Sequence, residues 1–332
     1  MLTDFHNFAQ IMVECDYRRM EQYDYNVAGH RFRVLADEGI ELAEALAPYA
    51  PFAADAHVKA ETALGTEAEL DAGAPVFRLR VVSEEELAVP EGLVLEFDQD
   101  DDGSQIRLYR TPSGESWFEF LLWGKLAGRM LASTDFQEAT LAIGKMGIGA
   151  GHSCFALNNA LMVMYALRCA RMGTALFHAA VVGYRGKGYL FLGKSGTGKS
   201  THARLWLQHI PGTELVNDDN PVVRVMEDGT ARVYGSPWSG KTPCYRNMDL
   251  PAGGFVQLEQ APVNEIRRLR GIAAYAALVP SISGKRWDRA IADGLHATEN
   301  ALAARVPVWH LRCLPDAAAA RLCAETVNGT AS

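Results

Sequence analysis

The sequence has no CxxC motif, although it contains six cysteines among 332 residues. They lie at positions 15, 154, 169, 244, 313 and 323, and no two of them form a CxxC motif. The sequence therefore predicts neither a zinc knuckle nor a thioredoxin-type redox site. Free cysteine usually behaves as a small apolar residue, so we expect isolated thiols in the core.

An excess of basic residues is also absent. The net charge of −8 gives no global attraction to nucleic acid or to an anionic membrane surface. The first ten residues, MLTDFHNFAQ, lack a basic region followed by an apolar run, so no secretory signal is predicted. The most apolar stretch, 160–182, is interrupted by Arg168 and Arg171, which would be costly at the centre of a bilayer. We expect a cytoplasmic protein without nucleic-acid or membrane partners.

The first half of the chain predicts a smaller, β-rich α+β domain over residues 1–143, because short strand-like segments alternate with turn residues. The acidic run Asp98–Gly103 lacks the spaced ligands of an EF-hand and is expected at a hairpin tip. The glycine-rich stretch 144–151 marks the expected domain boundary. Strands are expected at 27–34, 76–82, 93–97, 106–110 and 117–122, with a short helix at 38–46.

The second half, 144–332, alternates strands and helices in the manner of an α/β domain. A helix from Cys154 to Met172, capped by Ser153, is apolar almost all round and is expected to pack on both sides. Two hairpins make the predicted sheet mixed. The hairpins are expected at 222–226 with 232–234 and at 255–259 with 265–269, other strands at 175–182, 189–192, 214–217 and 308–313, and helices at 199–208, 288–305 and 316–327.

A glycine-rich segment, Gly193–Ser200, matches the motif G-x-x-x-x-G-K-[ST] in full and lies between a predicted strand and a predicted helix. Glycines allow consecutive N–H groups to turn toward phosphates, and the helix N-terminus adds partial positive charge. Lys199 is expected to reach the β- and γ-phosphates of ATP, and Ser200 to ligate Mg²⁺. The predicted nucleotide-binding residues are Gly193, Lys194, Ser195, Gly196, Thr197, Gly198, Lys199, Ser200 and Thr201.

Two adjacent aspartates, Asp218 and Asp219, follow the apolar strand residues Leu215 and Val216. A P-loop enzyme needs a carboxylate to hold its metal ion, and a second carboxylate can accept the proton of an attacking hydroxyl. Turns are also rich in Asp and Asn, so Asn217–Asn220 on its own would be predicted as a plain turn. With the P-loop upstream, we favour the functional interpretation.

His178 lies in the apolar segment 175–182, shortly before the P-loop strand. A histidine in an apolar strand is usually a core residue. However, this segment is expected to pair with 189–192, whose end carries the P-loop, and a histidine there would touch the phosphates or orient an aspartate.

The set His178, Gly193–Ser200 and Asp218–Asp219, in this order and at these short separations, resembles the catalytic domain of bacterial HPr kinase/phosphorylase. That domain belongs to a wider group related to phosphoenolpyruvate carboxykinase. The resemblance covers residues 174–260, and more loosely everything from residue 153 onward. It implies an α/β, mixed-sheet P-loop kinase domain of HPr kinase type, with Asp218 as base and Asp219 as metal ligand, two roles that can be exchanged.

The segment Gly235–Thr242 departs from that family, because it stands where the Arg-Gly-Leu-Gly-type segment of HPr phosphorylases is expected. HPr is therefore not the expected substrate. The segment resembles instead that of HPr-kinase-related proteins of unassigned or of small-molecule or peptide serine-kinase type. Lys241 is a candidate to clamp a γ-phosphate or an anionic acceptor. The alternative is a solvated lysine in a polar loop.

Together these features predict an ATP-dependent kinase that uses ATP and Mg²⁺ and phosphorylates a hydroxyl acceptor, a serine of a protein, a peptide or a small molecule. The predicted catalytic residues are Asp218, His178 and Lys241, and the predicted metal ligands are Ser200 and Asp219. One alternative is a nucleotide-gated binding module without transfer, and another is carboxykinase-like chemistry on a carboxylic acid. The sequence identifies neither the acceptor nor the oligomeric state, and a homo-oligomer is one of the states that it allows. By analogy, the domain 1–143 is expected to recognise the substrate or a partner.

Overall fold

The computed structural model describes residues 20–54, 74–144, 150–240 and 242–329. Packing divides the chain into two compact units. Unit 1 comprises Met1–Asn26 and His30–Arg168, and unit 2 comprises Val27–Gly29 and Cys169–Ser332. The boundary between the two units lies near residue 168, at the end of a long helix. The boundary expected from the sequence lies before that helix, near residue 144.

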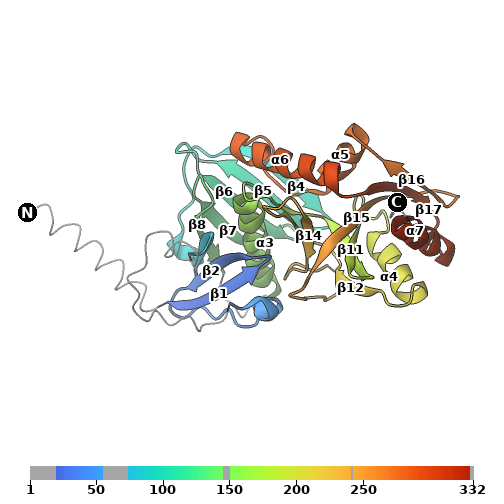
Figure 1. Cartoon of the computed structure of the whole chain (residues 1–332). Helices are drawn as coiled ribbons and strands as arrows, with labels where there is room; N and C mark the ends of the chain where they lie inside the picture. Colours follow the sequence, from blue (N-terminus) through green and yellow to red (C-terminus); the bar gives the residue numbers. More distant parts are fainter. Residues whose placement is uncertain (1–19, 55–73, 145–149, 241, 330–332) are drawn as a thin grey trace, which may run out of the picture. The chain divides into compact units, whose positions relative to one another are not determined.

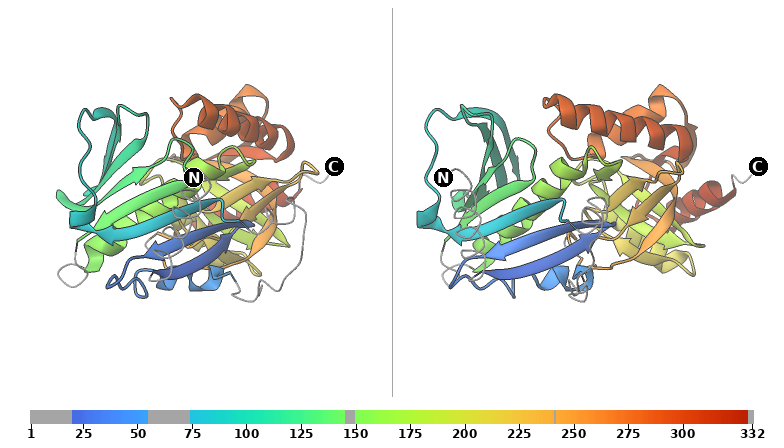
Figure 2. Two further views of the ribbon diagram at one scale, coloured as in Figure 1. Left: turned by 90° about the vertical axis from the view of Figure 1, so that its left-hand side faces the viewer. Right: turned by 60° about the vertical axis from the view of Figure 1, so that its left-hand side comes forward.

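Unit 1 is built on an eight-stranded sheet of order β1-β2-β3-β8-β7-β6-β5-β4 (Figures 1 and 2). β3 is parallel to both β2 and β8, and β4 to β8 form an antiparallel meander in which the acidic run makes the expected hairpin. The strands are β1 (Glu21–Val27), β2 (His30–Ala36), β3 (Phe77–Ser83), β4 (Val94–Asp101), β5 (Ser104–Arg110), β6 (Ser116–Leu122), β7 (Lys125–Ala132) and β8 (Glu138–Ile143), with 3-10 helices η1 (Ala47–Phe52) and η2 (Glu84–Glu86). Four of the five predicted strands are therefore present, with shifted ends.

Two local predictions in unit 1 are wrong. The segment 27–34, expected as one strand, is split by a turn at Ala28 and Gly29, whose φ angles are 51° and 80°. The helix expected at 38–46 does not form, and turn residues lead instead to η1, which has one proline at its start and another inside it. Proline fixes φ and removes a backbone donor, so it favours a short 3-10 turn over a continuing α-helix.

Helix α3 (Ala150–Cys169) packs within unit 1, where Asn158 accepts a hydrogen bond of 3.0 Å from the Tyr49 hydroxyl. The helix was predicted, but it begins earlier than expected, so Ser153 lies inside it and is not its cap. The Ser153 hydroxyl donates instead to the carbonyl of Gly144 at 3.4 Å. Neither α3 nor any other helix in the described residues has the length and apolar character needed to cross a membrane.

Unit 2 carries a nine-stranded sheet in which β11, β15 and β17 are parallel neighbours and the other pairings are antiparallel. Its main path is β12-β10-β11-β15-β14-β13-β9, and β17 pairs with both β15 and β16. The fold is thus α/β with a mixed sheet, as predicted. The strands are β9 (Thr174–Leu176), β10 (Ala179–Tyr184), β11 (Lys187–Leu192), β12 (Glu214–Asn217), β13 (Val222–Val225), β14 (Ala231–Tyr234), β15 (Asp249–Gln260), β16 (Glu265–Leu269) and β17 (Val308–Cys313).

Helices α4 (Lys199–His209) and α7 (Ala317–Gly329) lie side by side (Figure 1). Both contribute to one apolar core with the central strands of unit 2. Trp206 of α4 is fully buried, and its ring centroid lies 5.5 Å from that of Phe191 in β11. Burying a phenylalanine side chain contributes about 1.5–3 kcal/mol. The segment between β11 and α4 is therefore anchored in the core at both ends. The remaining helices are α5 (Ile272–Leu278), η3 (Val279–Ser281) and α6 (Arg289–Arg305).

Two strand predictions in unit 2 are wrong. Residues 175–182, expected as one strand, form β9 and β10 with Phe177 and His178 between them, because β9 pairs with β13 whereas β10 pairs with β11 and β12. The hairpin expected between 255–259 and 265–269 does not form, since β17 lies between β15 and β16. The other predicted hairpin is confirmed as β13–β14.

Candidate functional site

The glycine-rich loop, residues 193–198, connects β11 to α4 and has the conformation that its sequence requires. Gly193, Gly196 and Gly198 have φ angles of 154°, 76° and 105°, a region that other residues rarely adopt. A Cβ atom on Gly193 would lie 3.0 Å from the Thr197 side chain. Gly198 is the N-cap of α4 and offers no side-chain cap. The first-turn N–H groups of α4 are thus not capped by a side chain, which suits an anion.

Lys199 folds back onto the loop. Its side chain is buried, with 8% exposed, and its Nζ donates to the carbonyl oxygens of Gly193 at 3.0 Å and Lys194 at 3.3 Å. A buried ammonium group needs such partners, because removing it from water without them is costly. The cation is therefore held against the loop itself.

The acidic turn, residues 217–220, lies at the same end of unit 2 as the loop. Ala179 of β10 pairs with Leu192, the residue before the loop, and on its other side donates its N–H to the main-chain oxygen of Asp219 at 2.8 Å. Since neighbouring strands lie about 4.8 Å apart, the start of the loop and the Asp219 backbone are separated by about 10 Å. The loop and the acidic turn thus form one local site.

Asn217 fixes the shape of the acidic turn. Its side chain is fully buried, and its Nδ2 donates to the hydroxyl of Ser236 at 3.1 Å. Its Oδ1 accepts the main-chain N–H of Asp219 at 2.9 Å. The hydrogen bond to Ser236 is buried and the one from Asp219 is partly buried, so the turn is held from two sides.

The two carboxylates of the turn differ in exposure. Asp218 is buried, with 7% exposed, whereas 36% of the Asp219 side chain is exposed. The Nε2 of His178 lies 3.6 Å from Oδ1 of Asp219, which is too long for a hydrogen bond and makes an ion pair only when the imidazole is protonated. Asn220 donates from Nδ2 to the other oxygen of Asp219 at 2.8 Å. The structure therefore brings His178 beside Asp219.

The segment 235–240 packs against the acidic turn. The main-chain oxygen of Trp238, a fully buried residue, accepts the N–H of Asn220 at 3.1 Å. A Cβ atom on Gly240 would lie 3.1 Å from the Cβ of Asp219, so the backbone approaches that aspartate closely. Lys241, the predicted phosphate clamp, lies outside the described residues.

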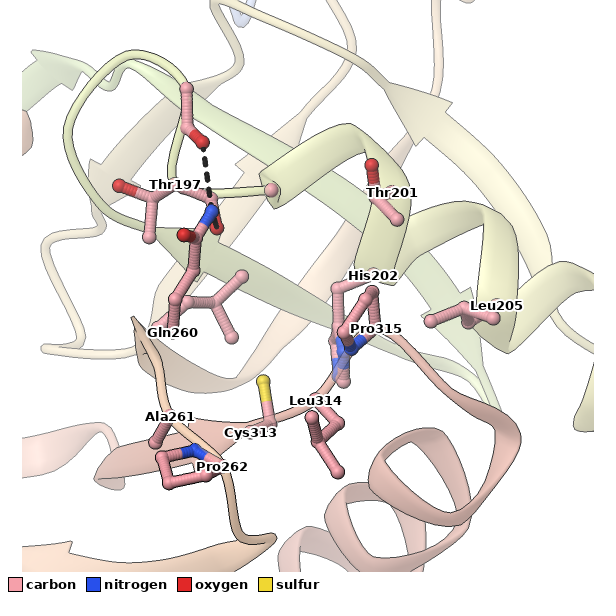
Figure 3. A pocket seen from close by; sticks show the side chains of 13 residues that line it. Thr197, Thr201, His202, Leu205, Gln260, Ala261, Pro262, Cys313, Leu314 and Pro315 are labelled. Carbon is pink, nitrogen blue, oxygen red and sulfur yellow. Dashed lines mark hydrogen bonds between the residues drawn. The ribbon is translucent and has the colours of Figure 1, made fainter.

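A pocket of about 610 Å³ opens on the other side of the loop (Figure 3). One wall comes from the loop and the first turns of α4, and the opposite wall comes from the residues that end β15 and β17. Gln260 joins the two walls, because its Nε2 donates to the carbonyl oxygens of Gly196 at 3.2 Å and Thr197 at 3.4 Å. The lining residues are Gly196, Thr197, Gly198, Thr201, His202, Leu205, Leu258, Gln260, Ala261, Pro262, Cys313, Leu314 and Pro315.

His202 is a buried, neutral member of this lining. Burial disfavours the imidazolium and lowers the pKa of His202 to about 4. Its Nε2 accepts a hydrogen bond of 3.1 Å from Nε1 of Trp206, so the ring proton is assigned to Nδ1. No hydrogen bond from that Nδ1 is found among the described residues.

Sequence reasoning missed several residues of this site. Asn217 and Ser236 lie within segments that the sequence singled out, and a polar residue directly after the apolar pair Leu215 and Val216 was an available signal for Asn217. The pocket residues after β15 and β17 match no motif, and only the parallel pairing of those strands brings them together.

Among the described residues, no group of three or more His, Cys, Asp or Glu side chains is arranged to hold a metal ion.

Comparison with protein-family models gives no match, and comparison with curated protein sequences gives none either. Among solved structures, the chain is similar to the HPr(Ser) kinase/phosphatase from Coxiella burnetii, with 12% sequence identity and a TM-score of 0.27. The match covers 46% of this chain and 93% of that chain. A likeness of this degree establishes neither a shared fold nor a shared activity.

Proposed function

We propose that the chain is an ATP-dependent kinase of the HPr kinase type, which transfers the γ-phosphoryl group to the hydroxyl of a protein, a peptide or a small molecule. The observation that carries this proposal is the local site in unit 2. A complete P-loop sequence forms a strand, a glycine-rich loop and a helix, and two aspartates lie one strand away from it. By analogy with other kinases, unit 1 is the candidate for acceptor recognition.

The loop fits a triphosphate with Mg²⁺. Its glycines adopt the required angles, its helix start has no side-chain cap, and the Lys199 ammonium is already held beside the backbone that would surround the phosphates. In this proposal Ser200, in the first turn of α4, and Asp219 hold the metal ion. Bound Mg²⁺ neutralises charge on the transferred phosphoryl group.

The acidic turn supplies the proton acceptor in this proposal. Asp218 takes the proton of the attacking hydroxyl, while His178 lies beside Asp219 and orients it. Lys241 follows Gly240, whose backbone approaches Asp219, and its ammonium would stabilise charge on the phosphoryl group. Positioning and charge neutralisation account for most of the catalysis in phosphoryl transfer, so these few groups suffice.

The proposal is tested by incubating the protein with γ-labelled ATP and Mg²⁺, with and without cell extract. Label transferred to a hydroxyl acceptor supports the kinase. Label in an enol phosphate, formed as a keto acid loses CO2, indicates carboxykinase-like chemistry instead. Release of free phosphate alone indicates a hydrolase, and ATP binding without turnover indicates a nucleotide-gated binding module.

Two matched variants separate the roles of the carboxylates. Asp218→Asn keeps the shape but not the base, so single-turnover transfer should fall by about 10²–10⁴ while ATP binding survives. Asp219→Asn should instead raise the Mg²⁺ concentration needed for nucleotide binding. Asp293→Asn removes a carboxylate that is 75% exposed on α6, and it should change neither property. Wild-type transfer by Asp218→Asn would exclude that residue as the base.

A further inference from the structure

We propose that the pocket beside the glycine-rich loop holds the nucleoside end of the triphosphate, and that it does so through uncharged contacts which distinguish adenine from guanine only weakly. This inference rests on the proposed nucleotide-binding function and specifies the part of the ligand that the P-loop motif does not address.

The place of the pocket follows from the strand order. β15 and β17 are parallel to β11, so the residues after all three strands meet at one edge of the sheet, where α/β proteins bind ligands. The acidic turn flanks β11 on the β10 side, whereas the pocket lies on the β15 side. A triphosphate held by the loop with its terminal phosphate toward Asp219 therefore has its nucleoside end toward the pocket.

The dimensions and lining of the pocket suit a nucleoside. Its volume of about 610 Å³ falls within the range of small-molecule sites. Leu205 and Leu314 offer apolar surface, and Pro262 and Pro315 add rigid rings (Figure 3). Leu258 also lines the pocket. The face of a nucleobase is apolar and polarisable, and it packs well on such surfaces.

The polar groups of the pocket are few and neutral. His202 is 3% exposed, and its Nε2 accepts the hydrogen bond from Trp206, so its Nδ1–H is a donor for which the described residues supply no partner. Gln260 uses its amino group on the loop, which leaves its carbonyl oxygen as an acceptor. None of the 13 residues lining the pocket has a carboxylate, an ammonium or a guanidinium group. Guanine presents N–H donors that a carboxylate would select, so the pocket lacks the group that would enforce a choice between the purines.

The test compares three Mg²⁺-bound probes by calorimetry, namely ATP, GTP and inorganic tripolyphosphate. Ala261→Trp fills the pocket, and Val263→Trp places the same ring on a nearby residue that is 41% exposed and outside the lining. We expect Ala261→Trp to weaken ATP binding by about tenfold or more without changing tripolyphosphate affinity, and the control to change neither. Wild-type affinities for ATP and GTP should agree within about tenfold.

Other outcomes overturn the inference in distinguishable ways. Unchanged ATP affinity in a folded Ala261→Trp protein removes the nucleoside from this pocket while the P-loop assignment stands. A hundredfold preference for one purine contradicts uncharged recognition. Failure of the wild-type protein to bind either ATP or tripolyphosphate removes the proposed function as well.

A second measurement needs no substitution and therefore cannot fail through misfolding. Cys313 lines the pocket, whereas Cys154 lies in α3 of unit 1, and both thiols are partly exposed. Burial raises the pKa of both thiols, so alkylation is followed at alkaline pH by mass spectrometry. Saturating ATP should protect Cys313 and not Cys154, and tripolyphosphate should protect neither. Equal labelling of Cys313 with and without ATP would refute the assignment.

Discussion

His202→Gln should make the protein less sensitive to mild acid. The His202 imidazole has a pKa of about 4 in the folded protein, against 6.5 in the unfolded chain, because burial disfavours its charge. Between these values the unfolded chain binds a proton that the folded protein does not bind. Unfolding is therefore favoured as the pH falls through this window, and the contribution of neutral His202 to stability is lost from about pH 6.5 downward.

The magnitude follows from the size of the shift. With these two pKa values, His202 alone should lower the free energy of unfolding by about 2 kcal/mol between pH 7 and pH 5, and by about 3 kcal/mol once the pH approaches 4. Glutamine does not titrate, and its side-chain oxygen can still accept the hydrogen bond from Trp206.

Urea denaturation of both proteins at several pH values between 7 and 4.5 measures this difference. The wild-type free energy of unfolding should fall more steeply than that of His202→Gln, by about 2 kcal/mol at pH 5. NMR titration of the His202 ring checks the cause directly. Parallel loss of stability in the two proteins, or a ring that titrates near pH 6.5, would refute the reasoning.

Three further substitutions test other contacts. Lys199→Ala removes the cation held against the loop, so ATP affinity measured by calorimetry should fall by about 10–100-fold in a folded protein. Asn217→Ala removes the side-chain hydrogen bonds that hold the acidic turn and should lower the free energy of unfolding by about 2–3 kcal/mol in urea melts. Glu299→Gln, in α6, removes a fully buried carboxylate that accepts from Arg286 at 2.6 Å and from Tyr275 at 2.7 Å, and it should cost about 3 kcal/mol in the same assay. Wild-type ATP affinity in Lys199→Ala, or a wild-type free energy of unfolding in either of the other two variants, would contradict the corresponding prediction.

Local sequence signals predicted the elements that carry the loop. The strand before Gly193 and the helix after it were predicted because the apolar run and the motif point to the same structure, and both form as expected. The strands 214–217, 265–269 and 308–313 were predicted with the bounds that the structure has. Such short segments combine an apolar pattern with clear turn residues at their ends, so local information suffices.

Long-range pairing was not predictable in the same way. The insertion of β17 between β15 and β16 joins segments that are distant in the sequence. The local pattern of Phe255–Glu259 predicts a strand, but it does not indicate whether that strand pairs with the next strand in the sequence or with a more distant one. The break at Phe177 and His178 has the same origin, because β9 and β10 serve different neighbours. The pocket could not be predicted from the sequence for the same reason, since it exists only once β15 and β17 are paired.

Strand direction explains why the candidate site collects segments that are far apart in the sequence. β12 is antiparallel to β10, and β10 is antiparallel to β11, so β12 runs in the same direction as β11, β15 and β17. The carboxyl ends of these four strands therefore meet at one edge, and each is followed directly by a segment of the site: the acidic turn, the glycine-rich loop, and the two ends that line the pocket. β10 runs the opposite way, so the residue that reaches this edge is the one that precedes it, His178. Strand order then sets the sequence of chemical groups along the edge, with carboxylates on one side of the glycine-rich loop and an uncharged pocket on the other. In the proposed function, a nucleoside triphosphate bound along this edge would place its terminal phosphate toward the carboxylates and its nucleoside toward the pocket, which is the orientation that transfer to a hydroxyl beside the acidic turn would need.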